Sequence, residues 1–331
     1  MASRPERFHR IVRLTFSLLL LVTLPALAGH PADDIKHTDP AAAVYRIQVV
    51  GGGQVADGSA VLIAPGRLLT ACHVTRRAGS IKVGRDELKW TAYPVATDIE
   101  HDLCVLAVPE LSAAAPAAIG PTDSLRLSDR VTTAGYRRGG RLDISHGEIK
   151  GLHAQDGAFV LQVSAPFDHG ESGGGLFDTA GRLIGFIGFK AVAGGDFHYA
   201  LPLAWAGDEI PGQASAAPYN TRIHKLAFWE RSDREKPLFL LAASLEANRD
   251  WKALQGVAQE WVIADANNPA SWFCLGRVLT KLKRPQAAAL AFGQAATLLP
   301  SSTGTSDLPG TPDKVADVVF RLVSLESAAV Q

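Results

Sequence analysis

Short runs of β-branched and apolar residues, separated by Gly, Asp, Pro or Arg, fill the chain from about residue 41 to residue 206. No stretch in this region has a helical period longer than one turn. Regularly spaced short strands are typical of a β-sandwich or of β-barrels. The Ala- and Pro-rich segment 111–121 divides the runs into two similar sets, which favours two barrels. The predicted strands are VYRIQVV, SAVLIA, SIKV, DLCVLAV, RVTTAGY, LDISHGEIKG, FVLQVS, RLIGFIGF and FHYAL.

From about residue 222 onward, the apolar residues follow a helical period. PLFLLAASLEANRD and DWKALQGVAQEWVIADANN predict a helix pair, with Asn and Asp at the breaks. Segment 267–300 resembles a tetratricopeptide repeat, although Leu279 stands where tyrosine is usual. The 34 residues before it resemble a degenerate copy, and 313–325 predicts a capping helix, with an ordinary helical bundle as the alternative. The matching positions are Trp272, Leu275, Gly276, Ala288, Phe292, Ala295 and Pro300.

The first 28 residues have the pattern of a signal peptide. Four arginines precede an apolar segment at 14–27, and small residues end at Ala28. The apolar segment is shorter than the roughly 20 residues that span a bilayer, and it contains Pro25. No cysteine follows Ala28, which disfavours a lipoprotein. We therefore expect export with cleavage and no stable membrane anchor afterwards; a retained anchor is the alternative.

The charges of the chain cancel, with 33 Lys plus Arg against 33 Asp plus Glu. No net field therefore draws it to nucleic acid or to an anionic membrane. Its three cysteines lack the close CxxC spacing of a structural zinc site. We expect neither a nucleic-acid partner nor a metal.

Three polar residues stand where a hydrolase needs them. His73 follows a strand in TACHV, Asp102 begins the strand HDLCVLAV, and Ser172 lies in the Gly-rich DHGESGGGLFD. A serine hydroxyl is a poor nucleophile near neutral pH, so a base must take its proton, and the pKa of imidazole suits that exchange. A partly buried carboxylate holds the ring in the useful tautomer. The three residues together predict a hydrolytic triad.

In these contexts the chain order His, Asp, Ser resembles that of the chymotrypsin-type serine proteases, over about 41–206. The chain looks most like the short bacterial trypsin-like peptidases. The resemblance implies an all-β two-barrel (chymotrypsin-like) catalytic domain, followed by a small all-α helical-repeat domain. It implies His73, Asp102 and Ser172 as the catalytic residues, and the backbone N–H groups of Gly170 and Ser172 as an oxyanion hole. It also implies that the exported protein is periplasmic or secreted.

The expected domains follow from these patterns. They are a signal peptide (1–28), an N-terminal linker (29–40), a trypsin-like protease domain (41–206), a second linker (207–235), tetratricopeptide-like helical repeats (236–302), and a tail with a capping helix (303–331).

GESGG also fits the G-x-S-x-G nucleophile elbow of the α/β-hydrolases. That elbow needs a helix directly after the serine and a histidine late in the chain. Ser172 is followed by three glycines, which are poor helix formers, and no alternating helices surround the strands. We therefore reject an esterase fold.

The resemblance also implies a substrate pocket around the serine. Lys190 and His198 at its wall either favour an acidic or polar substrate side chain or simply point to solvent. The residues expected to form the pocket are Phe167, Asp168 and His169 before the serine, with Gly188, Phe189, Lys190 and His198 opposite.

The sequence departs from the family at two positions, because Gly175 replaces the usual proline and Glu171 the usual Asp or Asn. In enzymes activated by cleavage, that acidic residue pairs with the new N-terminal amine. VVGGG (49–53) resembles an activation sequence, but it lies too close to His73 to leave room for the intervening strands. We interpret it as a hairpin turn, so activation by cleavage is unsupported.

By the same resemblance, Cys72 lies against the strand that carries Asp102 and Cys104. A Cys72–Cys104 disulfide is therefore expected; the alternative is two buried free thiols that pack as small apolar groups. Cys274 falls at a helical-repeat position and is expected in the core.

The sequence thus predicts an exported serine endopeptidase that hydrolyses peptide bonds through an acyl-enzyme, without a cofactor. Its partners would be a protein or peptide substrate and a protein bound at the helical repeats. The alternative is a catalytically dormant scaffold that acts as a protein-binding module through those repeats.

Overall fold

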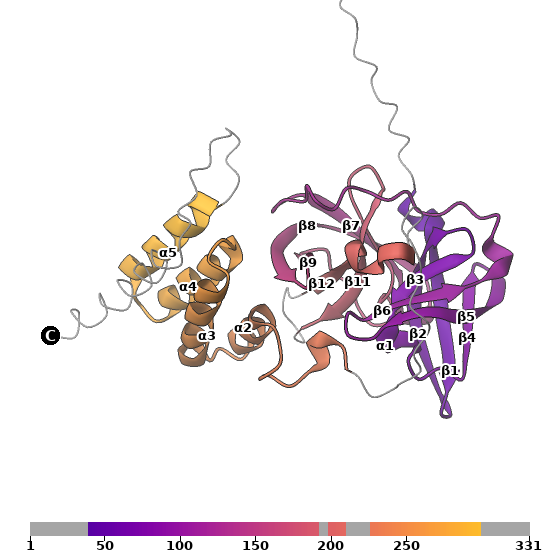
Figure 1. Ribbon diagram of the computed structural model, residues 1–331, viewed down its shortest axis with the longest axis horizontal. Coiled ribbons are helices and arrows are strands. Elements are labelled where there is room, and N and C mark those ends of the chain that lie inside the picture. The colour runs from indigo at the N-terminus through magenta and orange to yellow at the C-terminus, as the bar shows by residue number, and fades with distance from the viewer. Residues whose placement is uncertain (1–38, 192–197, 210–225, 299–331) are drawn as a thin grey trace, which may run out of the picture. The chain divides into compact units, whose positions relative to one another are not determined.

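The computed structural model describes residues 39–191, 198–209 and 226–298. Within these ranges, twelve strands form two closed antiparallel barrels of six strands each (Figure 1). The predicted signal peptide and the predicted C-terminal tail lie outside the described residues. The two barrels confirm the all-β two-barrel architecture expected from the strand pattern.

The first barrel has the strand order β1-β2-β3-β6-β5-β4. Its interior is filled by aliphatic side chains, among which Ile47, Leu62 and Leu106 are fully buried. The strands are β1 (Val44–Gly51), β2 (Gln54–Ala64), β3 (Arg67–Ala71), β4 (Ser80–Arg85), β5 (Leu88–Asp98) and β6 (Leu103–Ala107).

The second barrel has the strand order β10-β11-β12-β9-β8-β7. The Ala- and Pro-rich segment 111–121 lies in the connection between the two barrels, as expected. The strands are β7 (Arg130–Tyr136), β8 (Leu142–Gln155), β9 (Ala158–Val163), β10 (Gly175–Phe177), β11 (Leu183–Lys190) and β12 (His198–Pro202).

The turn between β1 and β2 shows how the sequence sets the register. Gly52 and Gly53 both have positive φ, 57° and 76°, as a two-residue hairpin turn of type I′ requires. Along β1, Ile47 and Val49 are buried, whereas Gln48 between them is exposed. The run VVGGG is therefore a hairpin turn, as interpreted from the sequence.

Three of the twelve strands are absent from the predicted list. β3 was expected only as the strand that precedes His73, whereas β5 and β10 were not predicted, each for a physical reason. β5 contains Pro94, which cannot donate a ladder hydrogen bond, and the pairing of β5 with β6 shifts register between Pro94 and Ala96. β10 is only three residues long, too short for an alternating pattern to be visible. Both strands are held by their neighbours in the closed barrel rather than by a local signal.

In the described part of the chain, four α-helices follow the barrels: α2 (Leu238–Ala247), α3 (Trp251–Ala264), α4 (Pro269–Lys281) and α5 (Pro285–Leu298). Asp250 caps α3 by accepting a hydrogen bond from Ala253 N at 3.1 Å, and Asn268 caps α4 by accepting from Ala270 N at 2.9 Å. The predicted Asn and Asp breaks are therefore helix N-caps. None of the helices in the described ranges is long and apolar enough to span a membrane.

The hairpin of α4 and α5 is closely packed at a glycine that matches the repeat pattern. A Cβ added at Gly276 would lie 2.6 Å from the Phe292 ring, so only glycine admits this approach. Trp272 and Ala288 are buried in the same hairpin. The helical architecture of this region is confirmed, while its identity as tetratricopeptide repeats remains a prediction.

The helices contact the second barrel through β8. The imidazole of His153 stacks on the Phe239 ring of α2, with ring centroids 4.4 Å apart and planes within 4°. Next to it, Asn268 Nδ2 donates to the carbonyl oxygen of Leu152 at 3.4 Å. His153 is 3% exposed, and this burial lowers its pKa from 6.5 to about 4. The contact therefore contains a neutral histidine with no charged partner.

Candidate active site

His73 lies on α1 (Cys72–Thr75), a single helical turn that begins directly after β3. The carboxylate of Asp102 binds it twice: Oδ1 accepts from the His73 backbone N–H at 2.7 Å, and Oδ2 lies 2.6 Å from the ring Nδ1. Cys72 N also donates to the Asp102 carbonyl oxygen at 3.0 Å. Both the backbone and the ring of His73 are thus oriented by one residue.

Asp102 occupies a constrained position just before β6. Its φ of 58° lies in the left-handed region, where an Asp is tolerated better than most residues, and its side chain is 1% exposed. Cys72 and Cys104 form a disulfide across the pair, with Cα atoms 4.9 Å apart. The disulfide expected from the resemblance is therefore present, and it ties the helix of His73 to the strand after Asp102.

The Asp102 carboxylate also sets the protonation of His73. Burial by itself lowers the pKa of the imidazole, because the charged form loses its water. The charge of Asp102 and its hydrogen bond to the ring outweigh that effect, so the pKa is raised above 6.5. The pair stabilises an imidazolium, which is the species formed when a histidine accepts a proton from a neighbouring hydroxyl.

Ser172 lies in the loop between β9 and β10, flanked by glycines with positive φ, 92° at Gly170 and 85° at Gly173. A Cβ on Gly173 would lie 2.3 Å from Thr70 Oγ1 and 2.9 Å from Ala71 N. The serine loop is therefore packed directly on the end of β3, immediately before His73. These glycines permit both the turn and the close approach.

Ser59 of β2 joins this loop to the first barrel. Its N–H donates to the Ser172 carbonyl oxygen at 2.9 Å, and its Oγ donates to the Gly170 carbonyl oxygen at 2.8 Å. The same Oγ accepts from Tyr136 N at 2.7 Å, and the Ser59 side chain is fully buried. The sequence analysis did not identify Ser59, because a lone serine inside a strand carries no motif.

Among the described residues, neither Gly170 N–H nor Ser172 N–H donates a hydrogen bond to the protein. This is the arrangement expected if both donors serve an oxyanion. Between them, the Glu171 carboxylate accepts from Asp168 N at 2.6 Å and from Arg137 Nε at 3.4 Å. Burial raises the pKa of Glu171. Both of these donors bind Oε2, whereas Oε1 is buried without a hydrogen-bond partner among the described residues.

The chymotrypsin-type family usually has proline at the position of Gly175, and the packing around this position explains the glycine. A Cβ at this position would lie 2.2 Å from the Phe177 ring. Glycine at this position therefore leaves room for the ring of Phe177, two residues further along β10.

The expected pocket residues separate into an apolar and a charged group. Phe167 is buried and makes an edge-to-face contact with His198, at 4.8 Å between ring centroids. His198 is 8% exposed, so the alternative in which it points to solvent is wrong. Gly188 lies at a bulge of β11 beside Phe189, which is 4% exposed. The Phe189 ring is buried between the rings that it stacks on, those of Tyr199 and Trp229.

The charged group surrounds Asp168. His169 Nδ1 lies 2.9 Å from Asp168 Oδ1, and Lys190 Nζ lies 3.7 Å from the same oxygen. The hydrogen bond with His169 is the main reason that the pKa of Asp168 is lowered to about 2. Lys190 thus forms an ion pair with Asp168 in the loop before Ser172, and the side chain of His169 is almost fully exposed.

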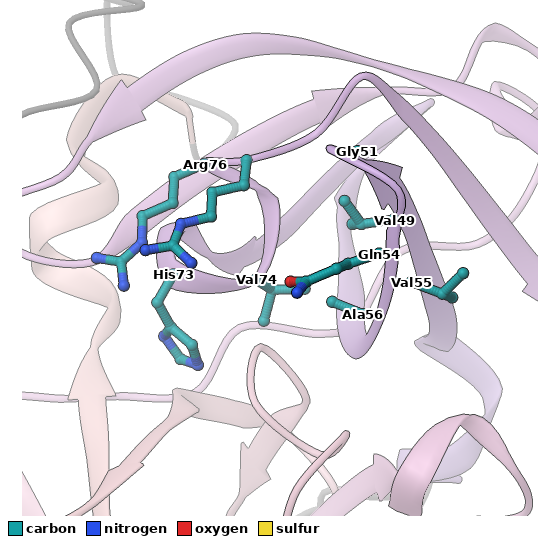
Figure 2. A pocket seen from close by; sticks show the side chains of 9 residues that line it. Val49, Gly51, Gln54, Val55, Ala56, His73, Val74 and Arg76 are labelled. Carbon is teal, nitrogen blue, oxygen red and sulfur yellow. The ribbon is translucent and has the colours of Figure 1, made fainter.

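A pocket of about 180 Å³ opens beside His73 on the side of the first barrel. Figure 2 shows His73 and Arg76 at one wall, opposite the β1–β2 hairpin with Gln54 and Val55. The remaining lining residues are Val49, Gly51, Ala56, Val74 and Arg77. The sequence analysis did not predict this pocket, because its two walls meet only when the barrel closes.

Trp229 is the other site residue that sequence reasoning missed. It lies in the region assigned to the linker, in the short turn η5 (Phe228–Glu230), yet its Nε1 donates to Asp102 Oδ2 at 3.2 Å. Its ring also contacts His73 edge-on, at 5.4 Å between centroids. No motif surrounds FWE, so only the fold reveals this contact.

Comparison with known proteins finds similarity to serine proteases. Residues 58–186 match the family model of the trypsin-like peptidase domain. The serine protease Rv3671c of Mycobacterium tuberculosis is 23% identical over 208 residues, which cover 60% of this chain and 51% of that protein. The periplasmic serine endoprotease DegP of Escherichia coli is 30% identical over 147 residues, which cover 41% of this chain and 31% of that protein.

Two solved structures are similar to part of the chain. The HtrA-type protease AlgW with a tripeptide has a TM-score of 0.47 and 30% identity, covering 50% of this chain and 58% of that one. The active form of Rv3671c has a TM-score of 0.48 and 22% identity, covering 64% of this chain and 98% of that one. The chain spans about half the length of the first curated relatives or less. The match to the trypsin-like peptidase domain model spans residues 58–186, which include strands of both barrels.

Proposed function

We propose that this chain is an exported serine endopeptidase whose catalytic residues are His73, Asp102 and Ser172. One observation carries the proposal. The buried Asp102 carboxylate binds both the backbone and the ring of His73, while the glycine-rich serine loop packs against the strand that leads to His73. This arrangement supports a role for His73 as the base for Ser172, because the Asp102 carboxylate orients its ring and stabilises the imidazolium that proton transfer would create.

In the proposed reaction, Ser172 Oγ attacks the peptide carbonyl while His73 Nε2 accepts the hydroxyl proton. The N–H groups of Gly170 and Ser172 stabilise the oxyanion, and one such donor typically contributes about 3 kcal/mol to the transition state. His73 then gives the proton to the leaving amine, and water hydrolyses the acyl-enzyme by the same route. This chemistry requires neither a metal nor an organic cofactor.

The substrate class is peptide or protein, supported by the similarity to proteins named serine proteases. The substrate pocket comprises the predicted residues around Phe167, Asp168 and Lys190. Homology to periplasmic DegP supports export, with residues 1–28 as the signal peptide. The helices α2–α5 serve as tetratricopeptide-like repeats that bind a substrate or partner protein.

Labelling with a fluorophosphonate probe tests the catalytic proposal directly. The purified chain is treated with the probe and the labelled residue is mapped, with Ser172→Ala and His73→Ala as controls. Label on Ser172 in the wild type, lost in both variants, is the expected result. A folded wild-type chain that takes no label would contradict the proposal and favour the dormant scaffold that acts through its helices.

Edman sequencing of the chain from the exporting cell tests the signal peptide. An N-terminus at Gly29 is expected. An N-terminus at the initiator region, with the chain in the membrane fraction, would show a retained anchor instead.

A further inference from the structure

The carboxylate of Asp102 accepts three N–H groups from two residues. His73 supplies its backbone N–H and its ring, and Trp229 supplies the indole Nε1–H at 3.2 Å to Oδ2. Since Asp102 is 1% exposed, water does not compete for these lone pairs. In a dry site, a hydrogen bond to an ionised acceptor is stronger than one in water, and it fixes the plane of the carboxylate. The indole therefore acts on the same oxygen that orients the His73 ring.

The Trp229 ring is held between the base and the second barrel. It stacks on Phe189 of β11, with centroids 4.7 Å apart and planes within 10°, and meets His73 edge-on at 5.4 Å. Phe189 is 4% exposed, so the surrounding side chains hold its ring in place. This packing leaves the indole little freedom to rotate away from Asp102.

The backbone around Trp229 is tied to the two loops that carry the base and the carboxylate. Arg76, on the helical turn of His73, forms a bidentate ion pair with Glu230. Phe228 N donates to the Glu100 carbonyl oxygen at 3.0 Å, and Arg231 Nη2 donates to Glu100 Oε1 at 2.6 Å. Glu100 lies two residues before Asp102. These polar anchors, Arg76 and Glu100, thus lie within three residues of His73 or Asp102.

We propose that Trp229 is a positioning residue of the active site, with its indole N–H fixing the Asp102 carboxylate that orients His73. The segment Ala227–Glu230, which follows the barrels in the chain, is then part of the catalytic apparatus and not a passive connection to the helices. The inference rests on the proposed function, in which His73 and Asp102 serve Ser172.

The variant Trp229→Phe separates the hydrogen bond from the packing, since it keeps an aromatic ring against Phe189 but has no donor. Two effects follow. The carboxylate loses a donor that partly neutralises it, so its attraction for the imidazolium strengthens and the pKa of His73 rises. The ring of His73 is also less firmly oriented. We expect the rate of fluorophosphonate labelling at neutral pH to fall about ten-fold.

The matched control is Trp205→Phe. Trp205 is also half-buried, and its Nε1 donates at 3.3 Å to the Asp156 carbonyl oxygen, away from the Asp102 carboxylate. This control removes an indole N–H of the same kind. It should leave both the labelling rate and the titration of His73 at wild-type values.

The experiment records two quantities on the full purified chain. Labelling rates are measured as a function of pH, and the ring of His73 is titrated by ¹⁵N NMR, which needs no activity. The expected result is a slower rate, with its acid limb moved to higher pH, and a raised pKa of His73 in Trp229→Phe alone. Wild-type labelling and wild-type titration in that variant would overturn the positioning role.

Two further outcomes are distinguishable. If the wild type takes no label, the proposed function fails, while the NMR comparison still decides whether Trp229 acts on His73 through Asp102. If Trp229→Phe does not fold, replacement of Trp229 by benzothienylalanine keeps the shape of the indole and removes only its N–H. The same two readouts on that variant then support or overturn the inference.

Discussion

Protonation of His153 should weaken the whole fold in mild acid. This histidine is buried between β8 and helix α2, with its ring stacked on Phe239 and its Nε2 3.2 Å from Gln162 Oε1. Tyr199 and Trp261 complete its ring contacts, and none of these neighbours carries a charge. An imidazolium there would lose its hydration without gaining a counter-charge.

The size of the effect follows from linkage. The pKa of His153 is about 4 in the folded state against 6.5 for an ordinary histidine, so the unfolded chain takes up the proton first as the pH falls. Stability is therefore lost progressively from about pH 6.5 down to about pH 4. At 1.36 kcal/mol per pH unit, the loss over this interval is about 3 kcal/mol.

The assay compares the free energy of unfolding of the wild type and His153→Phe by urea titration across this pH interval. The phenyl ring preserves the stack on Phe239 but does not titrate. Carboxylates titrate in both proteins and cancel in the difference, so the wild type should lose about 3 kcal/mol more than the variant. Parallel pH profiles for the two proteins would refute the reasoning. An NMR titration that finds the pKa of His153 near 6.5 would refute it as well.

Three other changes have defined consequences. Ser59→Ala leaves the Gly170 carbonyl and the Tyr136 N–H without their partner, so the free energy of unfolding in urea should fall by about 1–3 kcal/mol. Labelling of Ser172 by the fluorophosphonate should also slow; an unchanged unfolding free energy together with an unchanged labelling rate would contradict the anchoring role of Ser59. Replacing both Cys72 and Cys104 by serine removes a disulfide that spans 32 residues and should lower the free energy of unfolding by about 3 to 4 kcal/mol. A decrease below about 1 kcal/mol would contradict the loop-entropy estimate. Gly276→Ala places a methyl group against the Phe292 ring and should destabilise the helices by about 1–3 kcal/mol. Its control Gly256→Ala has open space around the added methyl group and should stabilise them by about 0.5–1 kcal/mol. Equal thermal stabilities of the two variants would refute the packing argument.

Local pattern was sufficient to predict much of the fold. Alternating burial in β1 and the paired glycines after it follow directly from the period of a strand and from the φ values of a tight turn. The helix caps at Asp250 and Asn268 are equally local, because each side chain reaches only two or three residues along the chain. β5 escaped prediction since Pro94 interrupts its pattern, and the closed barrel compensates for the missing donor.

The contact between His73 and Asp102 was also predicted, although through the order of motifs and the resemblance they carry. Ser59 and Trp229 were not, and the reason is physical. Their roles depend on hydrogen bonds that join residues 111 and 127 positions apart, which no local period or spacing encodes. The sequence by itself determined which residue types stand at the ends of which strands. Only the tertiary structure decided which distant donors meet the carboxylate and the serine loop, because that choice is made when the barrels close and the segment after them packs on the site.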